Sequence, residues 1–317
     1  MKGERQVMDL RPIHVIAASA AALLALAGCG EDSGATGRVQ VFVEPEDTIP
    51  DGLEPGTGEE NIQDGWTVTY DKFLVAVGNF RAARSADTSD QLSEPRVYVV
   101  DLKNVPTGGL VIAEFNDVTA SRWDKVGFDL PNATATAVRS ENTAQADHDF
   151  MVSNGYSLYI EATMTNPSGQ SCLPTAPTDC VAATTVAFKW GLRAGTSFDD
   201  CAPESGDAGF AVPSGGTVQV KPTIHGDHWF FTNITQGAEI TERRAQWIAN
   251  CDTDRNGETT QGELRAVQAA DVFPSPPYNL SGAILPVNTA FAYLEAQTRT
   301  LGDFQGEGEC PTRAVLP

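Results

Sequence analysis

The 317-residue sequence is poor in positive charge. It has 21 Lys and Arg against 42 Asp and Glu, and its formal net charge is -21 at pH 7. Binding to nucleic acid requires Lys and Arg to neutralise the phosphate backbone, so this deficit argues against a nucleic-acid partner. The acidic balance fits a protein that binds cations, or a secreted protein with a solvated acidic surface.

The signatures of nucleotide-binding and hydrolytic enzymes are also missing. There is no Walker loop, no dinucleotide-binding fingerprint and no G-x-S-x-G turn around a nucleophilic serine. The Gly-rich turns at 107–109 and 214–216 lack the lysine of a phosphate-binding loop. We therefore expect a binding or structural protein and not an enzyme. A hydrolase of envelope polymers is an alternative, although no nucleophile–base pair supports it.

Long apolar runs are absent except for one near the N-terminus. Residues 13–26 are apolar apart from one histidine and one serine, Arg11 precedes them, and small residues follow. The run is short for a transmembrane helix, and its layout is typical of a secretory signal peptide. No other stretch of the sequence is apolar enough to span a bilayer.

The end of this run is Leu26-Ala27-Gly28-Cys29, which resembles the lipobox of bacterial lipoproteins. The resemblance implies cleavage of a signal peptide over residues 1–28 and lipidation of Cys29. Because Gly30 follows the cysteine, it also implies an outer-membrane location. Residues 29–37 are then a flexible tether, and the membrane is the partner through the lipid. The alternative is an ordinary signal peptide with an incidental cysteine. No protein partner is predicted.

The remaining cysteines lie at 172, 180, 201, 251 and 310. In an oxidising compartment they are expected to form disulfides, and the odd number leaves one unpaired. Cys172 and Cys180 have the spacing of a staple across a hairpin loop. A pair between Cys251 and Cys310 is plausible and would leave Cys201 over. A metal–thiolate site is the alternative, although no C-x-x-C spacing is present.

The rest of the chain favours a mainly β fold. Short segments of alternating or apolar residues, such as 38–43 and 156–164, are separated by Gly- and Pro-rich stretches. This pattern predicts a β-sandwich over residues 38–235. Residues 44–65 and 81–95 are expected to be polar loops. Helical periodicity is confined to the C-terminal part, so residues 236–317 are expected to form a small helical appendage.

The strongest chemical motif lies in residues 252–263, which match D-x-[DN]-x-[DN]-G-x5-E at every specified position. Such a loop surrounds Ca²⁺ with six to eight hard oxygen atoms. Gly257 stands at the sharp turn, where a positive φ is needed. The predicted ligands are the side chains of Asp252, Asp254, Asn256 and Glu263, the backbone carbonyl of Glu258, and Thr260 directly or through water.

Together with its flanks, this loop resembles an EF-hand, a helix–loop–helix unit, over residues 240–271. Thr260 and Glu263 also form a capping box, which predicts that the second helix begins there. The loop departs from EF-hands in having Thr259 at position 8 and no second loop to pair with. The resemblance therefore implies a solitary structural Ca²⁺ site with a dissociation constant of about 10⁻⁴–10⁻³ M. An acidic turn that binds no ion is the alternative.

The histidines suggest a second metal site. His225 and His228 are three residues apart near the end of an expected strand, and His148 is a candidate third ligand. Such a set suits Cu or Zn. The pair and the β-rich composition resemble periplasmic copper-binding proteins of the methanobactin-associated type. A periplasmic copper- or zinc-binding protein is thus the alternative to the Ca²⁺-binding module. Histidines that merely hydrogen-bond nearby carboxylates are the simpler interpretation.

Overall fold

Strand β1 (Thr36–Pro45) shows how the alternation in the sequence becomes burial. Val39, Val41 and Val43 are fully buried, whereas the residues between them are exposed or partly exposed. The computed structural model describes residues 34–235 and 242–315. The lipobox and Cys29 therefore lie outside the described residues. From Ala35 onward the chain forms one compact unit.

Strands dominate this unit, so the prediction of a mainly β protein is confirmed. The other strands are β2 (Thr67–Arg84), β3 (Asp87–Asp101), β4 (Leu110–Thr119), β5 (Arg122–Trp123), β6 (Lys125–Leu130), β7 (Val138–Arg139), β8 (Leu158–Thr165), β9 (Gln170–Leu173), β10 (Ala176–Ala182), β11 (Thr185–Leu192), β12 (Thr196–Phe198), β13 (Phe210–Ala211), β14 (Thr217–Val220), β15 (Pro222–Ile224), β16 (Glu258–Thr259), β17 (Gly302–Phe304) and β18 (Thr312–Ala314). The helices are α1 (Gln145–Asn154), α2 (Gln246–Cys251), α3 (Gln261–Ala266), α4 (Ala269–Val272) and α5 (Ala290–Thr298), with 3-10 turns η1 (Leu102–Asn104) and η2 (His228–Phe230). No helix in the described part is long and apolar enough to cross a membrane.

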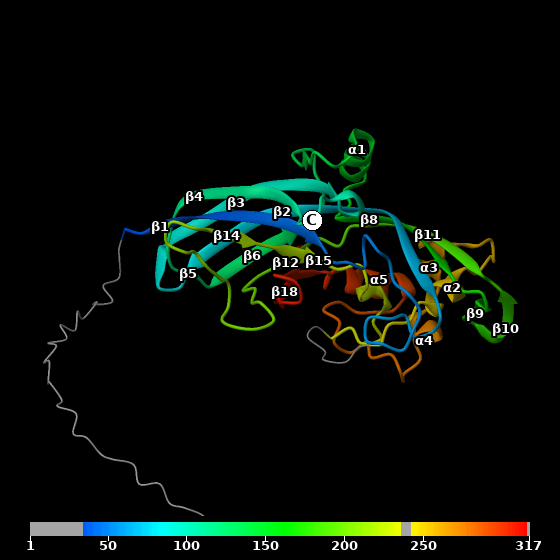
Figure 1. The fold of residues 1–317 in the computed structure, drawn as a ribbon. Coiled ribbons are helices and arrows are strands. Elements are labelled where there is room, and N and C mark those ends of the chain that lie inside the picture. The colour runs from blue at the N-terminus through cyan, green and yellow to red at the C-terminus, as the bar shows by residue number, and fades with distance from the viewer. Residues whose placement is uncertain (1–33, 236–241, 316–317) are drawn as a thin grey trace, which may run out of the picture. The chain divides into compact units, whose positions relative to one another are not determined.

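Two main sheets are curled against each other (Figure 1). The larger has the order β16-β11-β8-β2-β6-β12-β18, with β3 also paired to β2 and β7 to β3. The smaller has the order β14-β1-β15-β17, with β4 also paired to β1. A β-sandwich is consistent with this arrangement. The short pairs β9–β10 and β5–β13 complete the strand pairing.

The long strand β2 is covered on both faces. Phe73, Val75 and Val77 belong to the main core, which also takes in the buried valines of β1. Leu74 and Ala76 belong to a second, smaller core cluster. That second cluster lies under α1, which packs on the outer side of the large sheet (Figure 1).

Residues 81–95 are not the polar loop that the sequence predicts. Most of them form the outer halves of β2 and β3, which pair from Phe80 with Glu94 to Arg84 with Asp87. Phe80 and Ala82 face the core, but most of the other side chains in this hairpin are polar and at least partly exposed. Because most of its side chains are polar and face solvent, this strand pair has the amino-acid composition of a loop. The acidic segment 44–65 does contain a long irregular stretch, in which Asp47, Asp51, Glu54, Glu59 and Glu60 are exposed.

The C-terminal part contributes strands as well as helices, and a separate helical appendage is not confirmed. Strand β16 pairs with β11, β17 with β15, and β18 with β12. These strands are only two or three residues long, which is too short to give a readable alternation in the sequence. The helices of this part pack on the same core as the sheets.

Of the two expected disulfides, one is confirmed and one is wrong. Cys172 and Cys180 are bonded across the β9–β10 hairpin, where they are direct partners in the strand register. Cys310 bonds to Cys201 and not to Cys251, which is a buried free cysteine at the end of α2. Pairing of β12 with β18 holds the two segments that carry Cys201 and Cys310 side by side.

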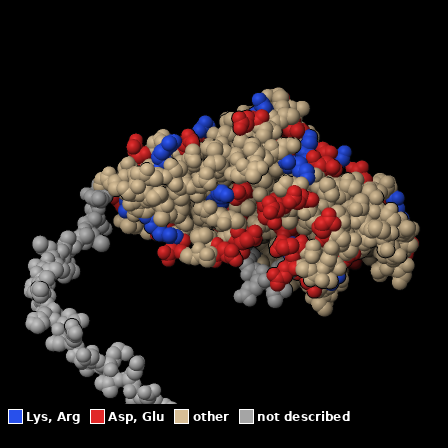
Figure 2. Space-filling model, in the orientation of Figure 1, with Lys and Arg blue, Asp and Glu red and all other residues tan. Residues whose placement is uncertain are grey.

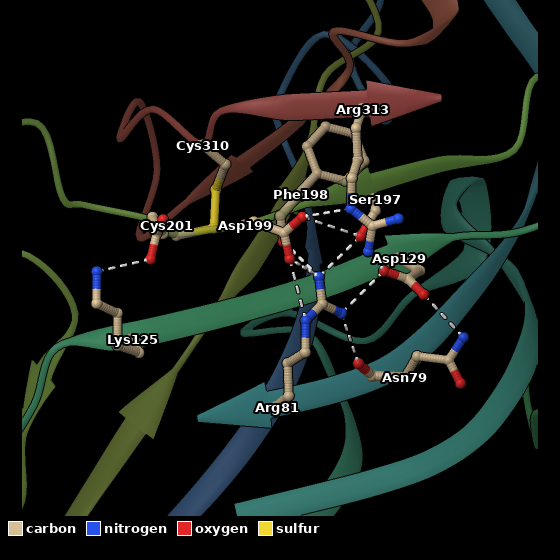
Figure 3. A network of polar contacts seen from close by, with 11 residues as sticks. Asn79, Arg81, Lys125, Asp129, Ser197, Phe198, Asp199, Cys201, Cys310 and Arg313 are labelled. Atoms are coloured by element: carbon tan, nitrogen blue, oxygen red, sulfur yellow. Dashed lines mark hydrogen bonds and ion pairs between the residues drawn. A yellow bond between two sulfur atoms is a disulfide. The ribbon is translucent and has the colours of Figure 1, made fainter. Parts of the chain in front are cut away.

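A polar network around Arg81 joins β2, β6, β12 and β18 beside this disulfide (Figure 3). The guanidinium pairs with Asp129 at 2.9 Å and with Asp199, and it donates to the Ser197 hydroxyl at 2.8 Å. Arg313 donates to the other oxygen of Asp199 at 2.9 Å. Burial acts to raise the pKa of Asp199, but these two arginines outweigh it and hold the pKa below its usual value.

We expect Arg81→Met to lower the free energy of unfolding by about 1–3 kcal/mol, because it leaves the mostly buried Asp129 carboxylate without its ionic partner. Urea unfolding followed by circular dichroism measures this loss. Arg313→Met is the control, because Arg313 is largely exposed and should cost about 1 kcal/mol or less. Equal losses in the two variants would contradict this account.

The ion pairs of Asp199 lower its pKa in the folded state. The stability that these ion pairs contribute is therefore present above about pH 4 and is lost as the pH falls further.

We expect removal of the Cys201–Cys310 bond by Cys201→Ser with Cys310→Ser to cost about 2–5 kcal/mol, because it releases a long loop in the unfolded chain. The double substitution Cys172→Ser with Cys180→Ser opens a loop of only 8 residues in sequence separation and should cost less. Denaturant unfolding without reductant compares the two. Mass spectrometry of Cys251→Ser should still show both disulfides, and loss of a cross-link to Cys310 in that variant would refute the pairing.

Candidate metal centres

The loop predicted to bind Ca²⁺ connects α2 to α3. Asp252 lies at the C-terminal end of α2, and Gly257 has φ of +86°, as its place in the motif requires. The flanking helices have only six residues each. The unit from the start of α2 to the end of α3 is therefore shorter than the helix–loop–helix predicted over 240–271. Upstream of α2, the backbone of Arg243 forms isolated β-bridges with Ile62 and Phe231. The chain is therefore extended there, and α2 begins only after Arg243.

Three carboxylates of this loop converge. Oxygen atoms of Asp252, Asp254 and Glu263 lie within 4.8 Å of one another. Glu263 Oε1 accepts hydrogen bonds from the backbone N–H groups of Thr253 and Asp254 at 2.8 and 3.2 Å. Asp252 accepts from the N–H group of Gly257 at 2.9 Å. The loop backbone thus orients acidic groups toward one point despite their mutual repulsion.

The other predicted ligands have partners within the loop. Asn256 Oδ1 accepts from the N–H group of Glu258 at 2.8 Å, and its Nδ2 donates to Asp254 at 3.0 Å. Thr260 is the N-cap of α3, and the expected capping box with Glu263 is present in both directions. The Thr260 hydroxyl therefore serves the start of the helix.

Thr259, at position 8 of the loop, pairs with the large sheet. Strand β16 lies parallel to β11, with Glu258 opposite Ala187 and Thr259 opposite Phe188. Thr259 is fully buried and its hydroxyl donates to the Ile248 carbonyl at 2.7 Å. Position 8 of the loop is thus paired with strand β11 of the large sheet.

The disulfide hairpin supports the loop from another side. The Cys172 N–H group donates to Asn250 Oδ1 at 3.0 Å, next to the start of the loop. Arg255, in the loop itself, pairs with Asp179 at 2.9 Å. The hairpin β9–β10 and strand β11 therefore both hold the carboxylate cluster in place.

The pKa shifts in this loop have opposite directions. Burial, backed by the nearby charges of Glu263 and Asp254, raises the pKa of Asp252. Burial also acts against ionisation of Glu263, but hydrogen bonds from Thr260, Asp254 and Thr253 prevail and lower its pKa. Burial thus disfavours the charge of Asp252, whereas hydrogen bonds stabilise the charge of Glu263.

A second cluster of ionisable groups forms around His225, just after β15. Strands β1 and β15 are parallel, so their C-terminal ends bring Glu46 and His225 to the same edge of the small sheet. Strand β17 runs antiparallel to β15 and carries Asp303 opposite Thr223. His228 stands at the start of η2, one turn beyond His225.

The two histidines and Asp303 lie close together. His225 Nε2 lies at ion-pair distance from Asp303 Oδ2, at 3.1 Å, although the geometry is not that of a hydrogen bond. The two imidazole rings have their centroids 5.0 Å apart. Ligand atoms of His225, His228 and Asp303 lie within 4.8 Å of one another.

Asp227 lies behind the histidines and is almost completely buried. Its Oδ2 accepts from Arg243 Nε at 2.7 Å, whereas its Oδ1 has no hydrogen-bond partner. Oδ1 is 3.8 Å from His225 Nδ1 and 3.9 Å from His228 Nε2. A buried carboxylate oxygen without a hydrogen-bond partner costs free energy. The side chains of this cluster therefore leave part of the negative charge of Asp227 unpaired.

Protons compensate part of the negative charge in this cluster. Burial lowers the pKa of His225, but Asp303, Asp227 and Glu307 prevail and raise it to about 10. Burial, together with the charge of Asp227, raises the pKa of Glu46 to about 7. Burial lowers the pKa of His228 to about 4, so its ring is neutral near pH 7 and its nitrogen is free to bind a metal.

His148 does not join the other two histidines. It lies in α1, on the outer side of the large sheet, where its Nε2 is 3.0 Å from the Ala137 carbonyl. Its Nδ1 is 3.1 Å from Asp149. Among the described residues, no metal-binding grouping includes His148, so the expected three-histidine set is not brought together.

Sequence reasoning noted Asp227 between the two histidines but missed Asp303 and Glu46 as parts of the histidine cluster. Asp303 and Glu46 are far from His225 in the chain and belong to no motif. Only Asp227, between the two histidines, carried a local signal. The parallel ends of β1 and β15 and the short strand β17 bring the distant carboxylates in.

Comparisons with known proteins add no relative to this description. No protein-family model, curated protein or solved structure matches the chain.

Proposed function

We propose that the protein is a lipid-anchored protein of the cell envelope that binds one Ca²⁺ ion through residues 252–263 and acts as a structural or binding module, without enzymatic activity. The observation that carries this proposal is the convergence of Asp252, Asp254 and Glu263 in a loop that matches the calcium motif throughout. Hard carboxylate oxygens at flexible spacing are the ligands that Ca²⁺ prefers.

The surroundings of the loop support a structural role for the ion. A bound Ca²⁺ would join the ends of α2 and α3 next to strand β11 and the disulfide hairpin. It would also relieve the repulsion among three close carboxylates. Because the partner of position 8 is strand β11 and not a second ion-binding loop, binding should be non-cooperative.

The envelope location rests on the sequence of the N-terminal segment, with support from the cysteines. The run before Cys29 has the order of a lipoprotein signal. Two disulfides in the described part fit an oxidising compartment outside the cytoplasm. Acidic side chains gather on part of the face shown in Figure 2, and the excess of acidic residues in the sequence fits attachment to a membrane through a lipid.

We expect the purified full chain to bind one Ca²⁺ with a dissociation constant of about 10⁻⁴–10⁻³ M, measured by calorimetry. At about 10 mM Ca²⁺ this affinity adds about 1.4–2.7 kcal/mol to the free energy of unfolding relative to protein in chelator. Glu263→Gln should abolish both effects, because it removes the charge of the bidentate ligand while it keeps the size of the side chain.

Glu258→Gln is the matched control for this experiment. Glu258 belongs to the same loop and is exposed, and its assigned ligand is the backbone carbonyl and not the carboxylate. This variant should therefore bind Ca²⁺ nearly as the wild type does. Absence of binding heat in the wild type, or an equal loss in both variants, would refute the proposed calcium site.

We expect Cys29→Ser to abolish lipidation and to leave the signal peptide attached, because cleavage and lipid transfer both depend on this cysteine in the lipoproteins that the segment resembles. Metabolic labelling with a tagged fatty acid, followed by fractionation of the envelope, measures both effects. The internal Cys251→Ser variant is the control and should be labelled as the wild type. Equal labelling of Cys29→Ser would show that the cysteine is incidental.

A further inference from the structure

We propose that His225, His228 and Asp303 form a second metal site, for a divalent transition metal of the Zn²⁺ class. The site goes beyond the proposed calcium function and does not depend on it. It differs from a three-histidine site because His148 lies elsewhere and a carboxylate from β17 is the third ligand.

The first support is the geometry of the donor atoms. Zn²⁺ binds imidazole nitrogen and carboxylate oxygen at about 2.0–2.2 Å, which places the ligands of a four-coordinate ion roughly 3.3–3.6 Å apart. His225 Nε2 and Asp303 Oδ2 are 3.1 Å apart, and all three ligand atoms lie within 4.8 Å of one another. Small side-chain rotations are therefore enough to surround an ion, with one position open for water. The ion replaces the proton of the His225 imidazolium, and that proton is released to solvent.

The second support is a buried carboxylate oxygen without a hydrogen-bond partner. Asp227 is 1% exposed, and its Oδ1 is unpaired, 3.8 Å from His225 Nδ1 and 3.9 Å from His228 Nε2. His225 is 2% exposed, and its Nε2 lies at ion-pair distance from Asp303 without the geometry of a hydrogen bond. Buried polar atoms are nearly always paired, so this incomplete pairing indicates that a cation is missing from the cluster.

The third support is the set of contacts made by the ring nitrogen of each histidine that would not bind the ion. Thr300 Oγ1 lies 2.8 Å from His228 Nδ1, which leaves Nε2 available. His225 Nδ1 faces Asp227 and Glu46 at 3.8 and 3.9 Å, while its Nε2 faces Asp303. Histidines that bind metals commonly direct their second nitrogen to a carboxylate, carbonyl or hydroxyl group, which fixes the ring.

The charge of the cluster points to a cation. Glu46, Asp227, Asp303 and Glu307 are four carboxylates near His225, whereas Arg243 is the permanent cation that contacts Asp227. A divalent ion supplies the positive charge that this buried set lacks. Neither grouping around His225 includes a cysteine, so the donors are nitrogen and oxygen, which suit Zn²⁺ better than Cu⁺.

The test uses the full chain, freed of metal with a chelator and then kept in excess Ca²⁺ so that the calcium loop is occupied. Co²⁺ is the spectroscopic probe, because it replaces Zn²⁺ and gives visible absorption bands at a four-coordinate protein site. We expect one equivalent of Co²⁺ to bind with such bands, and one equivalent of Zn²⁺ to displace it. The Glu263→Gln variant should give the same titration, which separates this site from the calcium site.

Asp303→Asn and His228→Ala should each weaken Zn²⁺ binding by about 100-fold or more. Asp303→Asn keeps the shape of the side chain, and His228 is the less buried histidine, so circular dichroism should show both variants folded. His148→Ala is the matched control and should titrate as the wild type. The proposal is overturned if the wild type binds no Co²⁺, if its bands persist in folded Asp303→Asn or His228→Ala, or if His148→Ala loses them equally.

Discussion

The buried ion pair between Asp227 and Arg243 is the constraint on which both candidate metal centres depend. Asp227 is almost fully buried, and a carboxylate in such a place is stable only when it is paired. Arg243 Nε donates to its Oδ2 at 2.7 Å, and the same guanidinium reaches Glu60 at 2.9 Å. Loss of one partner from a buried pair of this kind costs about 3–5 kcal/mol, which exceeds most single contacts in the chain.

This ion pair positions the chain on both sides. On one side, Asp227 holds its second oxygen between His225 and His228. On the other side, Arg243 fixes the segment that leads into α2, whose first N–H groups are capped by Asp64. The acidic loop 252–263 follows α2 directly. A single charge pair thus orients the histidine cluster and the entry to the acidic loop.

The sequence predicted those features that depend on neighbours in the chain. Alternation at Val39, Val41 and Val43 indicated β1, and the short spacing of Cys172 and Cys180 indicated their disulfide. The capping box of Thr260 and Glu263 was also readable, because it involves residues three apart. In each case the physical cause is local, so one stretch of sequence contains it.

Features that depend on distant segments were not readable. The cysteine partner of Cys310 is set by pairing of β12 with β18, and both strands are only three residues long. Asp303 reaches His225 only because β17 adds to the edge of β15. No spacing rule connects residues so far apart, and the excess of acidic residues offers many equally plausible partners. The acidic cluster and the close approach of His225 and His228 were readable because each lies in one stretch of sequence, whereas Asp303 was not, because a distant strand brings it in.

The difference between ligands from one loop and ligands from distant strands also determines which part of the fold a bound ion would stabilise. In the acidic loop the carboxylates all lie within residues 252–263, so an ion there would mainly hold a local turn against β11 and the hairpin. At the histidine cluster, an ion would join β15 to β17 and therefore close a long stretch of chain. Closing a long loop costs more conformational entropy than closing a short one, so the gain from fixing it is greater. Metal at His225 and Asp303 would thus stabilise the attachment of the C-terminal strands, whereas Ca²⁺ would stabilise one corner of the sheet.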